Sequence, residues 1–419
     1  MLRCFGLRKK GEIENPYETY FKIATMTMQI IGLWKSGTKR ELNYFIVVPF
    51  ILLMVAGNVG ILCAIYETRT NFTRSSETML YLILLIHTLN AYLTMVYNLN
   101  KINRNLTAVE EKFLMFERNL KRPVDHMRAS CQTSTIFFMK VVIGVVCSVH
   151  VSHFISSKSY LPNSPNKSLF FDVVLPYRPL DSEFYYYYAF IFEILIYIVE
   201  GCVNLSSITL NVGFLNILCV EIEIFGITLE NISYFEKPNV SENRHSSELG
   251  GDKLEIDEVS YEEKQVISKI VNQHRYLISL MNDVQSILSF IVLDMFVTCE
   301  FMLCLCSFQI YQIYSTTSFV SLMKNICMLA ALIVHEFVYF FFGQRLVSKT
   351  QDLHRSVYFC EWYNETKSFK NSMNIVHLRM NKPFTILAGK IIPVTLASFI
   401  TCLKAAFSYF NLLRALSHT

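Results

Sequence analysis

Histidine, cysteine and acidic residues stand at a few spacings that could hold a metal ion or perform catalysis. His335-Glu336 begins the zinc-protease pattern His-Glu-x-x-His, but Tyr339 occupies the place of the second histidine. His150 and His153 are three residues apart and could share a metal, yet no carboxylate or cysteine accompanies them on the same helix face. The sequence also has no glycine-rich phosphate-binding loop. We therefore expect no enzyme activity, no metal site and no cofactor.

A second group of reactive side chains consists of charges inside long apolar stretches. The acids are Glu193, Glu200, Asp294 and Glu300, and Lys140 and Lys324 are basic residues that likewise lie inside apolar stretches. A charge in hydrocarbon is costly and normally faces a partner, a cavity or water. We expect the acids to pair with these lysines, and an ion path is the alternative.

The composition shows how unusual these surroundings are. Of 419 residues, 52% are hydrophobic and 17% are charged, whereas a soluble domain carries about 25% charged residues. The apolar residues are gathered in long blocks, which disfavours a soluble globular protein. The net charge of +4 is too small to indicate a nucleic-acid partner.

Seven blocks are apolar enough to cross a bilayer, which takes about 20 helical residues. They are residues 42–66, 78–99, 134–157, 184–220, 284–306, 318–342 and 383–413. Residues 184–220 are too many for one crossing and too few for two, so we interpret them as one helix that extends beyond the lipid. The predicted fold class is an all-α membrane protein with seven transmembrane helices.

Positive charge predicts how these helices are oriented. Lys and Arg alternate along the connecting segments, with 28 on one side of the membrane and 6 on the other. Because cytoplasmic loops carry the excess of positive charge, we predict a cytoplasmic N-terminus and an extracellular C-terminus. This orientation is opposite to that of G-protein-coupled receptors.

The segments on the predicted cytoplasmic side are long, and we expect them to form helical extensions of the spans. The chain then divides into an N-terminal segment (1–41), helices one to four (42–220, with an inner loop at 100–133), a cytoplasmic loop (221–283), helices five and six (284–342), a further cytoplasmic segment (343–382) and the last helix (383–413). Apolar residues recur at helical spacing from 106 to 120 and from 267 to 280. Residues 236–265 contain nine acids, four bases and the Gly250-Gly251 pair, and are expected to be a disordered insertion.

The last span has two distinct faces when its residues are placed about 100° apart. One sector holds Thr401, Lys404, Ser408, Asn411 and Leu412 with Ala397 and Ala415, and the far side holds Leu396, Phe399, Leu403 and Phe410. Such a stripe fits close helix packing, but Lys404 equally favours a water-filled path. If several copies surrounded an axis, Leu412 would form an apolar ring able to gate conduction by dewetting, with the polar Asn411 beside it.

Several motifs resemble those of the insect odorant receptors. They are Ile31-Gly-Leu-Trp34, Phe342-Gly-Gln-Arg-Leu346, Glu361-Trp-Tyr-Asn364, Lys382-Pro-Phe-Thr-Ile-Leu-Ala-Gly-Lys390 with Pro393, Leu396 and Phe399, and Lys404 with Ser408-Tyr-Phe-Asn-Leu-Leu413. Together with the length, the seven spans and the inverted orientation, the resemblance covers nearly the whole chain.

The resemblance implies an odorant-gated, non-selective cation channel in the cell membrane, in the dendrite of a sensory neuron. A tuning subunit like this chain would assemble with a co-receptor subunit into a heterotetramer around a central pore. Residues 383–413 would be the pore helix, residues 343–382 would belong to the anchor that joins subunits, and the gate falls on Leu412. The family's Gln after the gate is absent, and Leu413-Arg-Ala415 stand there instead, which favours a tuning subunit.

The resemblance also implies that a small volatile odorant binds in the outer half of the bundle. The segments there offer apolar and aromatic side chains suited to such a molecule. The candidate contacts are Ile83, Val151, Phe154, Tyr187, Phe190, Ile191, Ile194, Phe319 and Met323, with His87 supplying one orienting hydrogen bond. Within the tyrosine run 185–188, we expect Tyr187 to turn inward and the others to anchor the helix at the bilayer edge.

Three other functions remain as alternatives. A gustatory-receptor-type ligand-gated channel would share this topology. A G-protein-coupled receptor needs a cytoplasmic C-terminal tail, but only six residues follow the last span. A transporter would show an internal repeat and broken helices, and we find no such repeat.

Overall fold

The computed structural model is almost entirely helical. It describes residues 26–34, 41–70, 72–116, 140–141, 144, 183–230, 251–314, 319–360, 362–364 and 366–416. The long helices are α2 (Tyr44–Thr68), α3 (Phe72–Phe116), α5 (Glu183–Glu230), α7 (Gly251–Tyr314), α8 (Phe319–Phe359) and α10 (Leu396–Leu416). The shorter elements are η2 (Trp362–Asn364), α9 (Lys367–Met380), β1 (Leu387–Ala388) and β2 (Ile392–Pro393).

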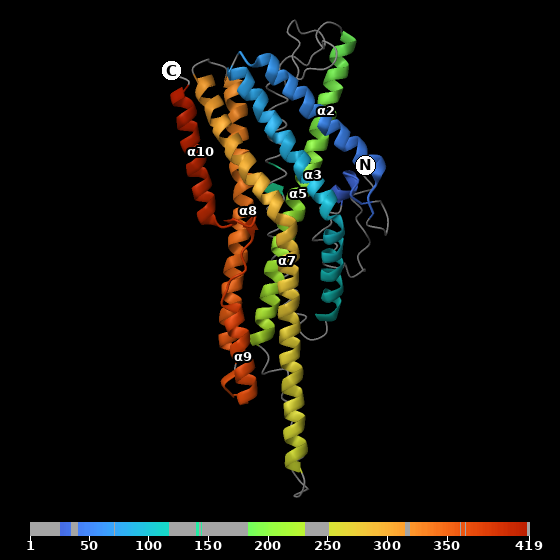
Figure 1. Ribbon diagram of the computed structural model, residues 1–419, viewed down its shortest axis with the longest axis vertical. Helices are drawn as coiled ribbons and strands as arrows, with labels where there is room; N and C mark the ends of the chain where they lie inside the picture. The colour runs from blue at the N-terminus through green and yellow to red at the C-terminus, as the bar shows by residue number, and fades with distance from the viewer. Residues whose placement is uncertain are drawn as a thin grey trace.

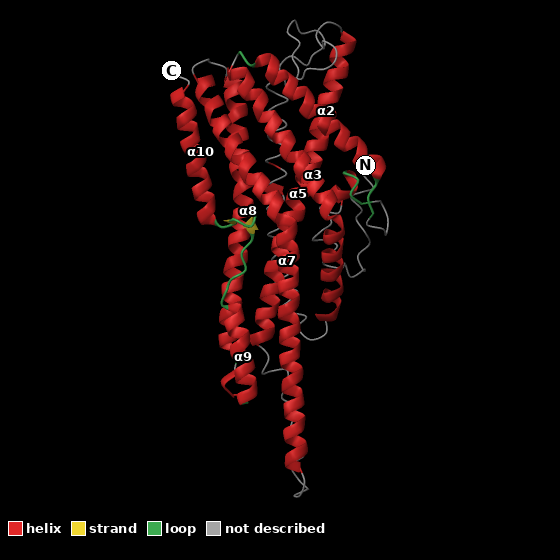
Figure 2. Cartoon of the chain, in the orientation of Figure 1, coloured by secondary structure: helices red, strands yellow, loops and turns green. Residues whose placement is uncertain are grey.

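Helices α5, α7, α8 and α10 run roughly along the longest axis of the molecule, whereas α2 and the first part of α3 are tilted across it (Figure 1). In one half, α10 lies at the edge of the bundle beside α8, and in the other half α9 lies against the end of α8. Helix α7 projects furthest beyond the rest. The small strand pair β1–β2 lies directly before α10, where the chain turns into that helix (Figure 2).

Six of the described helices are long and apolar enough to cross a membrane, and they are the six long helices named above. Six of the predicted spans overlap them. The predicted third span, residues 134–157, lies outside the described residues except for 140–141 and 144. Helix α5 continues without a break from Glu183 to Glu230, which confirms that residues 184–220 form one helix.

The predicted last span, residues 383–413, is wrong for its first 13 residues, 383–395. Helix α10 begins only at Leu396, and β1 pairs antiparallel with β2 ahead of it. Gly389 has φ +58° and Lys390 has φ +63°, a turn conformation that breaks a helix. The turn is held by Gln285 of α7, whose side chain donates to the Leu387 carbonyl at 2.7 Å and accepts from the Leu387 amide at 2.9 Å.

The expected disordered insertion at residues 236–265 is also wrong in its second half. Helix α7 already begins at Gly251 and continues for 64 residues. The physical reason is visible in the sequence: the acids that suggested disorder, among them Asp252, Glu255, Asp257 and Glu258, stand in the first turns of a helix, where the macrodipole favours negative charge. Residues 236–250 lie outside the described residues.

The helices continue well past their apolar stretches, as predicted for the cytoplasmic extensions. Arg104 of α3 lies 2.7 Å from Asp283 of α7, and Lys349 of α8 lies 3.0 Å from Glu223 of α5. Helix α9 folds back on α8, where the rings of His377 and His354 stack at 4.2 Å. These contacts form a second packed region beyond the membrane-length parts of the helices.

The described part of the N-terminal segment is fixed to the bundle. Met28, Ile31 and Leu33 are fully buried. The Tyr92 hydroxyl donates to the Ile31 carbonyl at 2.7 Å, and the Trp34 indole donates to the Asn103 side chain at 2.9 Å. The motif Ile31-Gly-Leu-Trp34 is therefore a joint between this segment and α3.

Candidate ligand site and pore helix

Helix α10 leaves its polar face uncovered. Thr401, Lys404, Ser408, Asn411 and Leu412 are all exposed, together with Ala397 and Ala415, whereas Leu396, Phe399, Leu403 and Phe410 on the far side are partly buried. Ala406 is the single buried residue of this fully described helix. The polar residues therefore lie on the exposed side of α10, which also carries Ile400, Phe407 and Tyr409, and no part of the described chain covers this side.

Aromatic rings attach the apolar face of α10 to its neighbours. The ring of Phe399 lies 5.7 Å from that of Phe337 and 5.5 Å from that of Phe340, both in α8. Nearer the C-terminal end, Phe410 contacts Tyr311 of α7 edge to face at 6.5 Å. Helix α10 is thus held on one side only, by contacts at two heights.

The segment that enters α10 is fixed more tightly than the helix itself. A Cβ atom added at Gly343 of α8 would lie 2.2 Å from the carbonyl oxygen of Val394. Val394 also donates its amide to the Ile386 carbonyl at 2.9 Å. The glycine in the motif Phe342-Gly-Gln-Arg-Leu346 is therefore needed so that the backbone before α10 can touch α8.

A polar cluster joins α3 to α7 in the middle of the bundle. His87 Nδ1 lies 2.6 Å from Asp294 Oδ2, and Asn90 donates to Asp294 Oδ1 at 2.8 Å. The Thr298 hydroxyl donates to the Asp294 carbonyl at 2.7 Å and lies 3.5 Å from the same His87 nitrogen. Because Asp294 occupies Nδ1, the other ring nitrogen of His87, Nε2, has to supply any hydrogen bond to a ligand.

The predicted pairing of the acids with Lys140 or Lys324 is wrong for Asp294. Lys324 instead lies 2.6 Å from Glu77 of α3, and Lys140 is exposed. Position along the helices explains the difference: Lys324 lies about 8 Å along α8 from its first residue, Phe319, whereas Asp294 lies about 30 Å along α7 from its last residue, Tyr314. The two side chains cannot meet across that separation.

The ligand-binding candidates divide into an inward and an outward group. His87 is buried, and Ile83, Phe190 and Ile194 are partly buried, whereas Tyr187, Ile191, Phe319 and Met323 are exposed on the single chain. Ile83 packs on a buried cluster that contains Leu80, Met302, Cys306 and Met328 of α3, α7 and α8. Val151 and Phe154 lie outside the described residues.

The tyrosine run at the start of α5 turns in a different register from the one expected. Tyr186 is 3% exposed and Tyr187 is 42% exposed, so Tyr186 is the residue that turns inward and the expectation for Tyr187 is wrong. The Tyr186 ring stacks on Phe190 one turn later, at 6.2 Å. A single-residue error rotates the face of a helix by about 100°, and tyrosines at all four positions give no pattern from which to choose.

Helix α7 contributes side chains beside the candidate ligand contacts that were not predicted from the sequence. Thr298, Met302 and Cys306 follow Asp294 at intervals of four residues and lie buried against α3 and α8. That spacing is the signal that places them on one helix face, and an acid inside a span marks the face that points into the bundle.

These features are those of an almost entirely helical, multi-pass membrane protein in which the described chain holds α10 on one side only. Its fold is that of solved insect olfactory receptors. The structure of the insect olfactory receptor OR5 from Machilis hrabei matches with a TM-score of 0.71 at 14% identity, covering 94% of this chain and 97% of the receptor. The structure of that receptor in complex with eugenol gives a TM-score of 0.69 at 14% identity, covering 96% of this chain and 98% of the receptor. The predicted fold class is confirmed.

The particular family follows from the sequence. The family model described as 7tm Odorant receptor matches residues 70–407, and the chain belongs to this family of multi-pass membrane receptors, which are not enzymes. Curated relatives include Odorant receptor 10 of Aedes albopictus, 27% identical over 150 residues, and Odorant receptor 23a of Drosophila melanogaster, 22% identical over 166 residues. The Odorant receptor coreceptor of Harpegnathos saltator is 23% identical over 150 residues.

These alignments span less than half of each curated relative. They cover 36%, 38% and 36% of this chain, and 39%, 43% and 31% of the three relatives in the same order.

Proposed function

We propose that the chain is the odorant-binding subunit of a ligand-gated, non-selective cation channel. It would bind a small volatile molecule in the outer half of the helical bundle and open a pore lined by α10. Membership of the 7tm Odorant receptor family supports the receptor function. The solved complex of the Machilis hrabei receptor with eugenol supports a small volatile compound as the ligand.

The observation that carries the pore assignment is the uncovered polar face of α10. Lys404 is exposed on a membrane-length helix, and an ammonium group that faces hydrocarbon is costly unless water or a partner carboxylate meets it. Thr401, Ser408 and Asn411 continue the same face. Copies of this helix around an aqueous axis would hydrate the whole stripe and bring Leu412 together as an apolar gate.

The partner that completes the pore would be an odorant receptor co-receptor subunit. Homology to the coreceptor of Harpegnathos saltator supports a shared architecture for the two kinds of subunit. The face of α10 that this chain leaves open needs at least one neighbouring subunit, since a single helix cannot enclose a conduction path. The cytoplasmic extensions, including residues 343–382, would anchor the subunits to one another.

The ligand would lie between α3, α5, α7 and α8. Ile83, Phe190 and Ile194 supply partly buried apolar surface there, and His87 adds one polar group. Tyr187, Ile191, Phe319 and Met323 face outward on the single chain, and as ligand contacts they would have to act from a neighbouring surface. Ligand binding would open the channel only if the ligand prefers the open bundle to the closed one.

The experiment that tests the proposal is current recording from cells that express this chain with and without a co-receptor. A panel of volatile compounds that includes eugenol should evoke cation current only when both subunits are present. Leu412→Ala should raise the resting current, because a smaller side chain leaves the constriction wetted. Leu52→Ala, at a similarly exposed leucine of α2 away from the proposed pore, serves as the matched control. Odorant-evoked current that is insensitive to changes along α10 would contradict the pore assignment.

The predicted orientation can be tested in the same cells. A tag placed after Thr419 should be accessible to antibody on intact cells, and a tag before Met1 only after permeabilisation. The reverse pattern would remove the channel topology, because the N-terminus is predicted to be cytoplasmic and the C-terminus extracellular.

A further inference from the structure

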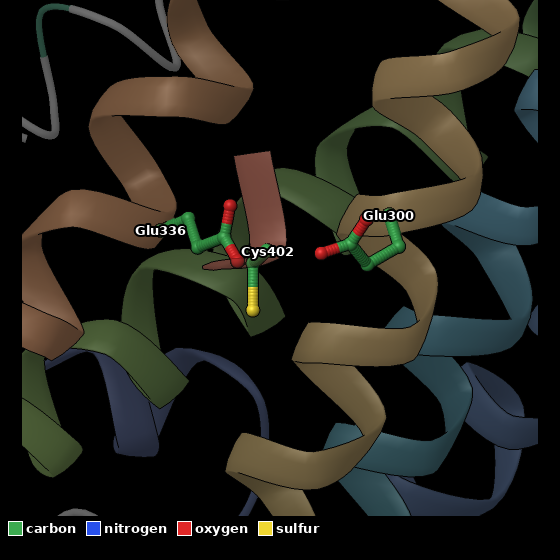
Figure 3. A group of neighbouring side chains, drawn as sticks. All are labelled: Glu300, Glu336 and Cys402. Atoms are coloured by element: carbon green, nitrogen blue, oxygen red, sulfur yellow. The ribbon is translucent and has the colours of Figure 1, made fainter. Parts of the chain in front are cut away.

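Three side chains from three helices meet on the side of α10 that faces α7 and α8. Glu300 of α7, Glu336 of α8 and Cys402 of α10 each place one ligand atom within 4.8 Å of the others. Figure 3 shows the two carboxylates approaching Cys402 from opposite sides. The Cys402 thiol also makes a hydrogen bond with Glu300. This group will be called the Glu-Glu-Cys cluster.

Glu336 is the member of the cluster that most needs a partner. Its side chain is 0% exposed, and neither of its carboxylate oxygens has a hydrogen-bond partner among the described residues. Glu300 Oε2 is likewise buried without a partner in the described part of the chain. A buried carboxylate without compensation is strongly unfavourable. Lys324, the cation of α8 within the apolar stretch, is already bound to Glu77 at 2.6 Å.

We propose that the Glu-Glu-Cys cluster binds one divalent cation of borderline softness, with Zn²⁺ the best fit. A thiolate and two carboxylates are a normal ligand set for Zn²⁺, whereas Mg²⁺ and Ca²⁺ bind oxygen ligands and avoid sulfur. Cys402 would release its proton to water to become a ligand, and the two positive charges of the ion would offset two of the three negative charges of the ligands. Three protein ligands leave a fourth position open for water.

The spacing of the ligand atoms is close to what a tetrahedral site requires. Zn²⁺ binds sulfur at about 2.3 Å and oxygen at about 2.0–2.2 Å, which places ligand atoms about 3.3–3.8 Å from one another. The cluster, at 4.8 Å or less, would have to contract by about 1 Å. Side-chain rotation of two glutamates is sufficient for a movement of that size.

The cluster also assigns a role to Glu336, which belongs to the incomplete zinc-protease pattern His335-Glu336-x-x-Tyr339. Glu336 follows His335, but the imidazole of His335 lies edge to face with Tyr339 at 5.5 Å, and the residue four positions on is this tyrosine rather than a histidine. The ligands that accompany Glu336 come instead from two other helices. Such a site is invisible to a search for ligands within one helix.

A bound ion would connect α10 directly to α7 and α8. The rest of α10 is held mainly by aromatic contacts on one side, so a coordinate link at Cys402 would restrain its movement. This inference needs only the positions of the three side chains, and it stands or fails separately from the proposed channel function because binding is measured on the protein itself.

Metal binding can be measured on the full chain purified in detergent. The protein is incubated with Zn²⁺, Cd²⁺ or Mg²⁺, separated from free ions by gel filtration, and its metal content determined by mass spectrometry. Cd²⁺ adds an ultraviolet charge-transfer band where a thiolate is the ligand. We expect the wild type to retain one Zn²⁺ or Cd²⁺ more than Cys402→Ser and Glu336→Gln, and to retain no Mg²⁺ at the cluster. Each variant should bind at least ~10-fold more weakly, since loss of even an indirect supporting residue costs about 10–100-fold.

Matched controls exclude effects of thiol or carboxylate number alone. Cys327→Ser removes a half-buried thiol of α8, and Glu200→Gln removes a buried carboxylate of α5; both should bind Zn²⁺ as the wild type does. Equal metal content in the wild type, Cys402→Ser and Glu336→Gln overturns the proposal and leaves protons as the groups that neutralise the carboxylates. Should a variant fail to fold, the wild type decides: Zn²⁺ should protect Cys402 from alkylation, and unchanged alkylation would overturn the site.

Discussion

Replacing Gly343 by alanine tests whether the backbone before α10 must touch α8. The added Cβ would lie 2.2 Å from the Val394 carbonyl oxygen and 2.8 Å from Val394 Cγ1, so the two segments would have to separate by about 1 Å to reach van der Waals contact. The clash is with backbone, which places its cost near the upper end of the 1–3 kcal/mol range, about 3 kcal/mol. Alanine recovers about 1 kcal/mol of helix propensity. The net expectation is a destabilisation of about 2 kcal/mol, or roughly thirtyfold in an equilibrium constant.

Gly57→Ala in α2 is the matched control for Gly343→Ala. It gains the same helix propensity, but its Cβ would be too close only to Ile196 Cδ1, at 2.8 Å, which is the end of a flexible side chain, while Leu85 Cδ1 at 3.5 Å is in ordinary contact. Thermal unfolding of the detergent-purified chain, followed by gel filtration of the surviving fraction, should rank Gly343→Ala below the wild type and Gly57→Ala close to it. If Gly343→Ala unfolds at or above the temperature of Gly57→Ala, the close approach between α8 and Val394 does not fix the entry to α10.

Three further outcomes follow from other parts of the fold. Asp294→Ala should lower the stability of the chain by about 3 kcal/mol, because the buried His87 and the half-buried Asn90 of α3 lose their hydrogen-bonding partner; thermal unfolding measures this, and an unchanged midpoint would contradict the pairing. Phe190→Ala and Ile194→Ala should change the ranking of odorants more than the maximal current, and a uniform loss of current would instead indicate misfolding. Burial and the neighbouring His354 lower the pKa of His377 from 6.5. The unfolded chain therefore takes up the proton first, and the stability of the fold should fall as the pH drops below about 6.5. His377→Gln should reduce this dependence of stability on pH in unfolding measurements between about pH 7.5 and about pH 5.5, and an unaltered dependence would exclude this histidine.

Four of the five motifs that resemble odorant receptors are joints between elements, whereas the fifth, from Lys404 to Leu413, lies within α10. Gly32 has φ +79° and lies beside Trp34, which is bonded to α3. Gly343 admits the Val394 carbonyl against α8, and Gly389 turns the strand pair with its Cα so close to Leu293 that a Cβ would lie 2.6 Å from that side chain. Trp362 begins the 3-10 turn η2 between α8 and α9. These four motifs include none of the proposed ligand contacts, and they identify a fold more directly than a ligand.

The two segments whose secondary structure differs from the prediction, residues 383–395 and 251–265, share one physical cause. Residues 383–395 are apolar, and their hydropathy is that of a span, but Gly389 and the proline at 393 turn the chain into a strand pair clamped by Gln285. Residues 251–265 are acidic, and their composition is that of a disordered segment, yet they form the start of α7. In both segments composition measures the preference for lipid or water, whereas backbone conformation depends on local φ values and on neighbours from other helices.

Hydropathy and helical spacing alone were enough to predict which segments leave water, that they are helical, and that Thr401, Lys404 and Ser408 lie on one side of α10. These properties follow from hydropathy and from a period of 3.6 residues, both of which are local. Only the tertiary structure decided that His87 meets Asp294, that Lys324 meets Glu77, and that Glu300, Glu336 and Cys402 come together. Pairings of this kind depend on the depth and rotation of helices far apart in the chain, and a shift of one residue, about 1.5 Å and 100°, is enough to change every partner.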